Sequence, residues 1–395
     1  MAALGALGKV QEGNADAITP GVVWANDLDF GSAAALIHTV SKIGCPELLV
    51  SYTDAAKLSV GADVRFDRVV CDVPCSGDAT LRKNADKWLR WNTAMGVGHH
   101  GQQLRILLRG LALLAPGGRL VYSTCSLNPV EDEAVVAAAL TLLGDRVRLR
   151  AVPVLPGARW RGGLLDWAVP RPNLGDAGAM RSLEQEAEAA EQEAEAAEQA
   201  DAASGVGPPL ELYREIAAVP PELTAAPRRG SGGVRLTASM FASSMSADAI
   251  AQLHHCVRVL PHHMDTSGFF LAVFERVPEA EAAEAAEADV KEAPAEVRAL
   301  REEHAALLAT PAPSTSKQSR AWLFHPLKPT SAEWASVSDF FGLHETFSAQ
   351  LVFRDQVGKH ILFATTAAGR ALVQQATTRK FKFVGVGTRL VRLGV

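Results

Sequence analysis

Two cysteine-centred segments are the places in this 395-residue sequence where residue types and spacing could do chemistry. In CDVPCSGDATLRKN (71–84), Cys75 stands in a Pro-Cys-Ser-Gly turn shortly after Asp72. In YSTCSLNPVEDEAVV (122–136), Cys125 is followed by an Asn-Pro turn and three acidic residues. A thiol beside the backbone N–H groups of a strand-to-helix turn ionises readily, and a thiolate is a strong nucleophile. One such cysteine would be interpreted as a small buried residue, but two of them, each beside a turn, favour chemistry.

The sequence around these segments alternates between strand-like and helix-like runs from residue 21 to residue 150. Short apolar runs predict strands at 21–25, 46–52, 66–72 and 118–125, and helical spacing predicts helices at 31–44, 101–114 and 131–143. Repeated βα units predict an α/β fold with a doubly wound, Rossmann-like parallel sheet. Such sheets collect their chemistry at the carboxyl ends of the strands. The residues at or just after predicted strand ends are Asp27, Asp54, Asp72 and Cys125.

These motifs resemble the Sun-type (RsmB/NOP-like) RNA cytosine-5 methyltransferases, and their eukaryotic tRNA-modifying branch in particular. The strings DVPCSGD…RKN and STCSLNPVEDEAVV match that branch nearly residue for residue. Four flanking blocks are similar and occur in the same order: VVWANDLD (22–29), YTDAAKL (52–58), RGGLLDW (161–167) and RVLPHHMDTSGFF (258–270). The resemblance implies a Rossmann-like methyltransferase sheet that uses S-adenosylmethionine to methylate carbon 5 of cytosine in RNA, with tRNA as the expected substrate.

The resemblance also implies roles for the residues around the two cysteines. Carbon 5 of cytosine attacks a methyl donor only after a nucleophile has added at carbon 6, and by the family pattern that nucleophile is Cys125. Cys75 would assist loss of the carbon-5 proton and release of the enzyme. Asp72 would hydrogen-bond the base edge and also border the cofactor. The target base must leave any stack to reach such a pocket.

Cofactor and substrate contacts follow from the same resemblance. Asp27 would hold the ribose hydroxyls of S-adenosylmethionine, and Asp54 would lie near its adenine. On the RNA side, we expect contacts from Pro74, Arg82 and Lys83, with the two basic residues facing phosphate. A solvated turn or a solvated basic loop is the structural alternative for the aspartates and for the basic pair.

Net charge agrees with an RNA partner only when it is divided along the chain. The formal charge is −5, but residues 184–201 and 279–296 together carry −14, which leaves +9 on the remainder. We therefore predict a methyltransferase catalytic domain at 1–177 and 232–277, interrupted by an acidic Ala/Glu-rich insert at 178–231. An acidic and polar linker at 278–320 leads to a basic α/β unit at 321–395, which is weakly similar to the PUA-like end of the same branch. From residue 348 onward this unit holds eight basic residues and one acidic residue, a density that suits phosphate contacts.

One element of the family pattern is absent from the sequence. The glycine-rich turn of Ala-Ala-Pro-Gly-Ser-Lys type, which follows the first strand of the sheet, is not found, and residues 1–10 align with the helix after it. We expect an N-terminally truncated chain whose first strand is missing, which would leave the two neighbouring strands with unpaired backbone groups. The alternative function is that of a non-catalytic RNA-binding relative that has lost the loop for the methyl donor.

Other classes of protein fit the sequence less well. An adenine amino-methyltransferase needs an Asn/Asp-Pro-Pro-aromatic turn, whereas this chain has Asp-Val-Pro-Cys at 72–75, and thiol redox chemistry leaves the acidic and basic neighbours unexplained. Five cysteines without framework spacing indicate a reducing intracellular compartment. We expect no metal, since adjacent His262 and His263 would point apart on an extended segment. We also expect no membrane span, a monomer, and a location in the nucleus or nucleolus, with the cytoplasm as the alternative.

Overall fold

The computed structural model describes three long stretches of the chain and parts of the C-terminal unit. The described residues are 2–5, 21–172 without 41–44, 59, 61–63, 85 and 154, 210–225, 234–278, and then 324–328, 330–331, 334–335, 338–339, 351–356, 359–366, 369–374, 383–386 and 388–394. The repetitive segment 186–199 of the predicted insert and residues 279–320 of the predicted linker lie outside them. Most of the run AEWASVSDFFGL (332–343), whose spacing predicts a helix, also lies outside them.

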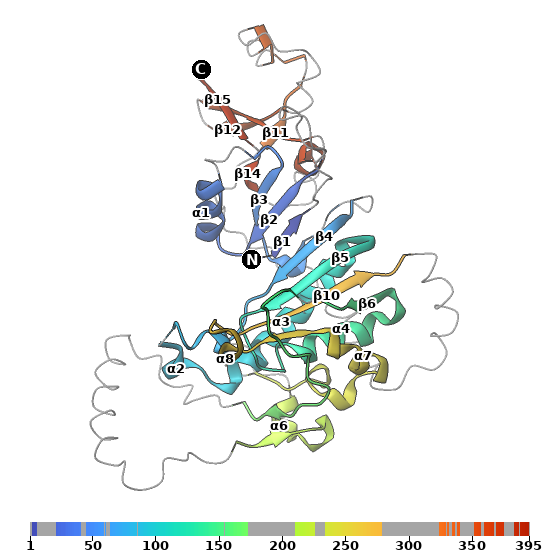
Figure 1. Ribbon diagram of the computed structural model, residues 1–395. Helices are drawn as coiled ribbons and strands as arrows, with labels where there is room; N and C mark the ends of the chain where they lie inside the picture. Colours follow the sequence, from blue (N-terminus) through green and yellow to red (C-terminus); the bar gives the residue numbers. More distant parts are fainter. Residues whose placement is uncertain are drawn as a thin grey trace, which may run out of the picture.

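A mixed sheet runs through the molecule in the order β14-β3-β2-β1-β4-β5-β10-β6, with β9 paired to β10 (Figure 1). Its strands are β1 (Ala2–Gly5), β2 (Val23–Asp27), β3 (Leu48–Tyr52), β4 (Phe66–Asp72), β5 (Leu114–Thr124), β6 (Val147–Arg150), β9 (Val257–Val259), β10 (Phe269–Arg276) and β14 (Phe383–Val386). The pairs β2–β3 and β4–β5 are parallel, as predicted. The α/β class is confirmed, but the purely parallel sheet is wrong, because β1, β10 and β14 run antiparallel to their neighbours.

Strand β1 occupies the place in the sheet that was expected to be empty. Residues Ala2–Gly5 pair antiparallel with β2 on one side and with β4 on the other, so the expectation of a missing strand, and of a helical alignment for these residues, is wrong. The physical reason is that two neighbouring open strand edges carry rows of unsatisfied N–H and C=O groups, which a short extended segment of either direction can pair. Antiparallel pairing places the carboxyl end of β1 opposite to those of β2 and β4.

Helices and short turns connect and cover these strands. The helices of the catalytic region are α1 (Phe30–Val40), α2 (Asp86–Arg90), α3 (Thr93–Leu113) and α4 (Glu133–Leu143), and the 3₁₀ turns are η1 (Ala55–Lys57), η2 (Asp78–Thr80) and η3 (Gly144–Arg146). Asn92 caps α3, since its side chain accepts from the Met95 N–H. Helix α3 packs on β4, β5 and α4, and nearly every residue of α4 is buried. This burial fixes the start of α4, directly after the Cys125 segment.

A further layer of short elements covers α4. It contains β7 (Val169–Pro170), β8 (Leu212–Tyr213), η4 (Ile216–Ala218), α6 (Pro221–Thr224), η5 (Ala238–Met240), η6 (Ala242–Ser244), α7 (Ala247–Gln252), η7 (Leu253–His255) and α8 (Pro261–Met264). Strand β8 and α6 fall inside the segment predicted as an acidic insert, and Tyr213, Val219 and Leu223 from this part join the main hydrophobic core. The domain boundaries as a whole stay a prediction.

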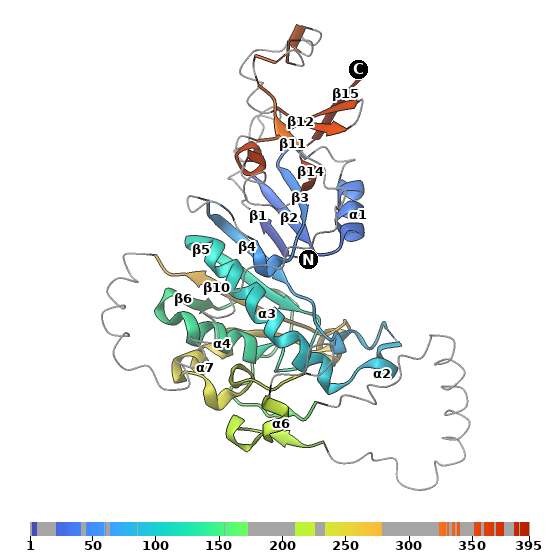
Figure 2. The same cartoon turned by 180° about the vertical axis from the view of Figure 1, so that it is seen from behind.

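The C-terminal unit contributes a second sheet of β11 (Phe324–Pro326), β12 (Leu351–Gln356), β13 (Lys359–Ala364) and β15 (Thr388–Gly394), all antiparallel. The run FKFVGVGTRLVRL (381–393) by its apolar pattern predicts one last strand, but the structure has two strands there, β14 and β15. Strand β14 leaves this unit and pairs with β3, and Phe383 packs 5.8 Å from Trp24 between ring centroids. Both views place the second sheet next to the β14–β3 end of the main sheet (Figures 1 and 2). In the described part of the chain, no helix has the length and apolar character needed to cross a bilayer.

Candidate active site

The two predicted reactive cysteines meet where neighbouring parallel strands end. Strands β4 and β5 are paired so that Asp72 lies opposite Ser123, and each chain then turns away from the sheet. Cys75 follows β4 by three residues and Cys125 follows β5 directly, which places the two Sγ atoms 3.2 Å apart. Both side chains are partly exposed. Residues 50 positions apart in sequence therefore form one thiol pair at the carboxyl edge of the sheet.

The environment shifts the pKa values of the two thiols in opposite directions. The pKa of Cys125 is lowered to about 7, mainly by the hydrogen bond from Cys75 and to a smaller extent by the Lys87 ammonium, against the opposing effects of burial and of the Asp72 charge. The same hydrogen bond raises the pKa of Cys75 well above that of a free thiol, and burial adds to the rise. Near neutral pH the pair therefore holds a Cys125 thiolate that accepts a hydrogen bond from the Cys75 thiol.

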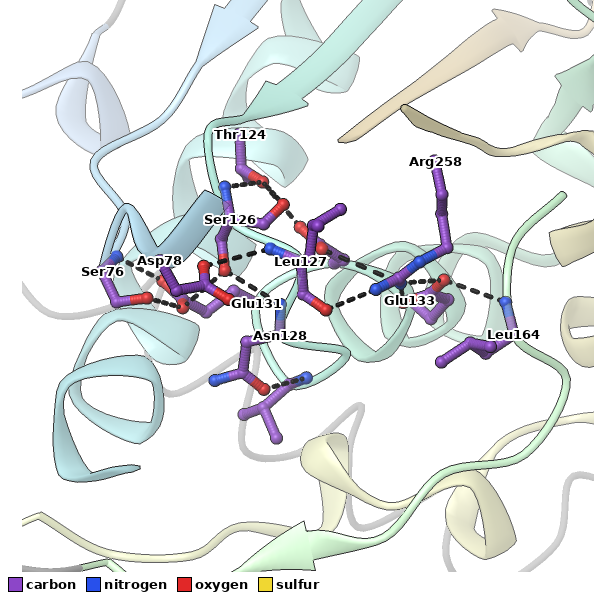
Figure 3. Close-up of polar contacts among 12 residues, drawn as sticks. Ser76, Asp78, Thr124, Ser126, Leu127, Asn128, Glu131, Glu133, Leu164 and Arg258 are labelled. Carbon is purple, nitrogen blue, oxygen red and sulfur yellow. Dashed lines mark hydrogen bonds and ion pairs between the residues drawn. The ribbon is translucent and has the colours of Figure 1, made fainter. Parts of the chain in front are cut away.

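A buried carboxylate joins the two cysteine-bearing loops (Figure 3). Glu131 Oε1 accepts from the Ser76 N–H at 2.8 Å and from Gln103 Nε2 at 3.1 Å, while Oε2 accepts from Ser76 Oγ at 2.5 Å and from Ser126 Oγ at 3.0 Å. Ser76 follows Cys75 and Ser126 follows Cys125. Four donors on one buried carboxylate thus hold the residues after both cysteines at a constant separation.

Two helices support the Cys75 loop from its other side. Gln103 of α3 also donates to the Pro74 carbonyl at 2.9 Å, and Lys87 of α2 donates to the Ser76 carbonyl at 2.9 Å. Between them, Gly77 has a positive φ of 70°, and a Cβ there would lie 2.3 Å from Lys87 Nζ. Glycine is therefore favoured at this turn by its left-handed backbone conformation, and the absence of a Cβ leaves the space that Lys87 Nζ occupies.

A buried arginine fixes the loop that follows Cys125 (Figure 3). Arg258 Nη1 lies 2.6 Å from both oxygens of Glu133, and its Nη2 donates to the Leu127 carbonyl. The neighbouring Asp132 accepts from Thr124 Oγ1 at 2.6 Å, and burial together with the Glu133 charge raises its pKa well above the usual value. Arg258 thus neutralises part of an acidic group that would otherwise be costly to bury.

The predicted residues beside the thiol pair lie at the same edge of the sheet. Asp72 is exposed and accepts from Ser123 Oγ at 3.1 Å, and Pro74 is exposed in the turn before Cys75. The side chain of Asp72 is close enough to the pair for its charge to act on Cys125. The structure therefore brings Asp72, Pro74, Cys75 and Cys125 together, as expected, although their catalytic roles stay predictions.

Comparison with known proteins agrees with this geometry. Residues 17–159 match the family model described as 16S rRNA methyltransferase RsmB/F. The chain is 35% identical over 271 residues to a tRNA (cytosine(34)-C(5))-methyltransferase of Drosophila melanogaster, covering 66% of this chain and 30% of the relative. It is 35% identical over 268 residues to a multisite-specific tRNA:(cytosine-C(5))-methyltransferase of Saccharomyces cerevisiae, covering 65% and 32%. A relative of the latter description in Schizosaccharomyces pombe is 31% identical over 400 residues, covering 93% and 51%.

The chain belongs to the Sun-type family of RNA methyltransferases. It spans about a third to a half of the length of these curated relatives.

The carboxylates expected on the cofactor side of the Sun-type site lie at the ends of adjacent strands. Asp27 ends β2 and accepts from the Asp29 N–H at 2.8 Å. Asp54 follows β3, accepts from the Ala56 N–H as the cap of η1, and forms an ion pair with Lys57 at 3.0 Å. Capping of η1 and the ion pair give Asp54 a structural role, and its expected place beside the adenine stays a prediction.

The basic residues expected on the RNA side of the Sun-type site are exposed. Arg82 forms an ion pair with Asp265 at 2.7 Å, and the Lys83 side chain is exposed. His262 and His263 lie in α8 rather than on an extended segment, as Pro261 starts a helical turn there. Among the described residues, no three His, Cys, Asp or Glu side chains are arranged to hold a metal ion.

Sequence reasoning missed the residues that position the thiol pair of this Sun-type site. They are Lys87, Gln103, Glu131, Glu133 and Arg258. The acidic run 131–133 was noted as a helix start, but three consecutive acidic residues are usually interpreted as a solvated first turn. The burial of these acidic residues could have been predicted from the apolar run of α4 that follows them, because that run is too hydrophobic for a surface helix.

Proposed function

We propose that this chain methylates carbon 5 of cytosine in RNA, with tRNA as the substrate class and S-adenosylmethionine as the methyl donor. The observation that carries the proposal is the pair of thiols 3.2 Å apart, one with a lowered and one with a raised pKa. Cytosine-5 methylation needs a thiolate to add to the ring and a second group to accept a proton later, and the pair supplies both. The three tRNA methyltransferase relatives support the substrate class.

The steps follow from the state of the pair. The Cys125 thiolate forms a bond to carbon 6 of a cytosine that has left its stack, and Asp72 hydrogen-bonds the base edge as charge develops. Carbon 5 becomes nucleophilic and takes the methyl group that the bound donor supplies. Once Cys125 is bonded to carbon, the main cause of the raised pKa of Cys75 is gone, so Cys75 releases its proton to water more easily. Its thiolate then accepts the carbon-5 proton, the bond from sulfur to carbon 6 breaks, and the Cys125 thiolate is restored.

The described residues fit the adenosine half of the donor. Asp27 and Asp54 present carboxylates at the ends of neighbouring strands, where they could accept hydrogen bonds from ribose and adenine. Between these positions, Phe30 is about half exposed and packs edge-on against Tyr52 with ring centroids 5.4 Å apart. An exposed aromatic surface beside carboxylates suits a purine nucleoside.

RNA would reach the thiol pair across a surface formed by α2 and the turn before it. Arg82, Lys83 and Arg90 are exposed there, and Trp88 has 69% of its surface exposed. Positive charge with an exposed aromatic ring is the combination that holds a single-stranded nucleic acid, by phosphate contact and by base stacking. We also propose a PUA-like role in RNA binding for the C-terminal unit, on its excess of basic residues. A monomer and a nuclear location stay predictions.

The experiment uses unfractionated tRNA and S-adenosylmethionine with a radiolabelled methyl group. We expect label in 5-methylcytosine with the native chain and none with Cys125→Ala. Cys75→Ala should accumulate a covalent protein–RNA adduct visible on a denaturing gel, because addition proceeds while elimination stalls. Persistence of that adduct in the double variant Cys75→Ala/Cys125→Ala would contradict the assignment of Cys125. Retained tRNA binding without methyl transfer or donor binding would support the non-catalytic alternative.

A further inference from the structure

Two consecutive residues of the short helix α2, Lys87 and Trp88, differ in their surroundings. Lys87 is half-buried and its Nζ donates to the Ser76 carbonyl at 2.9 Å, whereas the next residue, Trp88, is exposed. The point where a Cβ on Gly77 would stand lies 2.3 Å from Lys87 Nζ and 3.6 Å from Cys125 Sγ. The ammonium group and the Cys125 sulfur are thus separated by the space that a missing side chain leaves open.

We propose that Lys87 is a positioning residue for the reaction, whose charge holds the Cys125 sulfur in its thiolate form while its hydrogen bond holds the Cys75–Gly77 turn. The proposal rests on the proposed function only in treating Cys125 as the nucleophile. It adds a positive group to the thiol pair at a place that none of the sequence motifs indicated.

Among the described residues around Cys125, Lys87 is the cation whose charge has the largest effect on the thiol. From the β4 loop come the Cys75 thiol, which donates to Cys125, and the Asp72 carboxylate, whose charge opposes thiolate formation. From the other side, the charge of Glu131 raises the pKa of Cys75, and the Arg258 guanidinium is engaged by Glu133 and the Leu127 carbonyl. Lys87 is the cation whose charge lowers the pKa of Cys125, after the larger effect of the hydrogen bond from Cys75.

Two consequences follow for the geometry. Lysine has a flexible side chain, so its ammonium can follow the sulfur as the thiolate adds to a base. Gly77 makes this position of the ammonium possible, since a Cβ there would displace Lys87 Nζ from the space between the turn and the sulfur. The Ser76 carbonyl accepts a hydrogen bond from the Lys87 ammonium and so holds it in place in the free protein.

The experiment measures the pH dependence of Cys125 alkylation by iodoacetamide in the full chain, with Cys125 and Cys75 distinguished by peptide mass spectrometry. This reaction needs neither RNA nor methyl donor, so its outcome is independent of whether the chain transfers methyl groups. We expect the midpoint of the Cys125 profile to rise by about one pH unit in Lys87→Met. The alkylation rate at pH 7 should then fall roughly fivefold, since the thiolate fraction falls from about a half to about a tenth.

Three further variants separate charge from structure, each checked for native circular dichroism. Lys87→Gln keeps a donor for the Ser76 carbonyl but no charge, and should raise the midpoint as Lys87→Met does. Lys87→Arg keeps the charge and should hold the midpoint within about half a unit of the native value. Lys328→Met removes the same charge from an exposed site in the C-terminal unit and should leave the midpoint unchanged. A native midpoint in Lys87→Gln, a raised one in Lys87→Arg, or an equal rise in Lys328→Met would overturn the proposal.

Discussion

At the scale of single residues, this site depends on a few buried polar groups that keep two flexible loops in one arrangement. The thiolate form of Cys125 is favoured by the hydrogen bond from Cys75 and by the charge of Lys87, and the loop that carries Cys75 is held by hydrogen bonds from Gln103 and Lys87. Glu131 connects that loop to the Cys125 loop through four hydrogen bonds. Substitution of Glu131, rather than of either cysteine, is therefore the most direct test of this arrangement.

Glu131→Ala should lower the free energy of unfolding by about 3–5 kcal/mol, because it leaves the four donors without an acceptor in a buried space. Glu131→Gln should cost less, since the two N–H donors still meet an amide oxygen and the two serine hydroxyls can turn to accept from the amide nitrogen. Urea denaturation of both variants tests this order. A cost below about 1 kcal/mol for Glu131→Ala would contradict it.

At the scale of elements, α2 and the turn before it form the surface across which we propose that RNA reaches the thiol pair. Arg82 forms an ion pair with Asp265, beside the end of α8, so two segments far apart in sequence lie side by side there. Figures 1 and 2 place α2 at the outer edge of the catalytic region. Here an exposed tryptophan, which can stack on a base, stands next to three exposed basic residues, which can contact phosphate. The arrangement suits nucleotides next to the target base.

Trp88→Ala should weaken tRNA binding about tenfold, the effect of losing one stacked base, with little change in protein stability because the ring is exposed. Trp88→Phe should retain most of the affinity. Leu210→Ala removes another well-exposed apolar side chain and is the matched control, with native affinity expected. Fluorescence anisotropy with end-labelled tRNA measures all three, and equal affinities for Trp88→Ala and the native chain would count against stacking.

At the scale of the whole molecule, segments from both ends of the chain complete one sheet. Strand β1 closes the gap between β2 and β4, and β14 extends the sheet beyond β3. Between them, Trp24 packs on Phe66 and Phe383 with centroid distances of 6.0 and 5.8 Å. The stability of the cofactor-side strands therefore depends on the C-terminal unit.

Phe383→Ala should reduce stability by about 3–5 kcal/mol, because it removes a fully buried aromatic ring. Hydrogen exchange followed by mass spectrometry should show faster exchange in β2 and β3. Phe363→Ala is the comparison: its ring packs on Phe324 within the second sheet, so faster exchange should concentrate in β11–β13. Native exchange rates in β2 and β3 of the Phe383 variant would mean that β14 is not an integral strand of the main sheet.

The buried His100 should make stability depend on pH. Burial lowers its pKa to about 4; its Nδ1–H donates to the Val130 carbonyl at 2.7 Å, and the Ser239 hydroxyl lies 2.9 Å from Nε2. Because the unfolded chain takes up this proton near pH 6.5 and the folded chain only near pH 4, stability is full above pH 6.5 and falls between those values by roughly 2–3 kcal/mol.

His100→Asn does not titrate, so its stability should approach that of the native chain as the pH falls from 7 to 4.5. Denaturant unfolding of both proteins across this range tests the prediction. A stability difference that stays constant with pH would show that His100 does not carry the effect.

The sequence by itself determined the α/β class, the two cysteine motifs and the strand ends that carry Asp72 and Cys125. These features depend on local patterns: apolar runs of strand length, turn residues after them, and a specific order of short motifs. It did not determine strand direction, because β1, β10 and β14 have the same local patterns whether they run parallel or antiparallel. Only the tertiary structure decided that the first and last segments join the central sheet, since open strand edges accept any segment that can reach them. It also decided that Lys87, Glu131 and Arg258 surround the thiol pair, because burying and pairing such charges depends on neighbours distant in sequence.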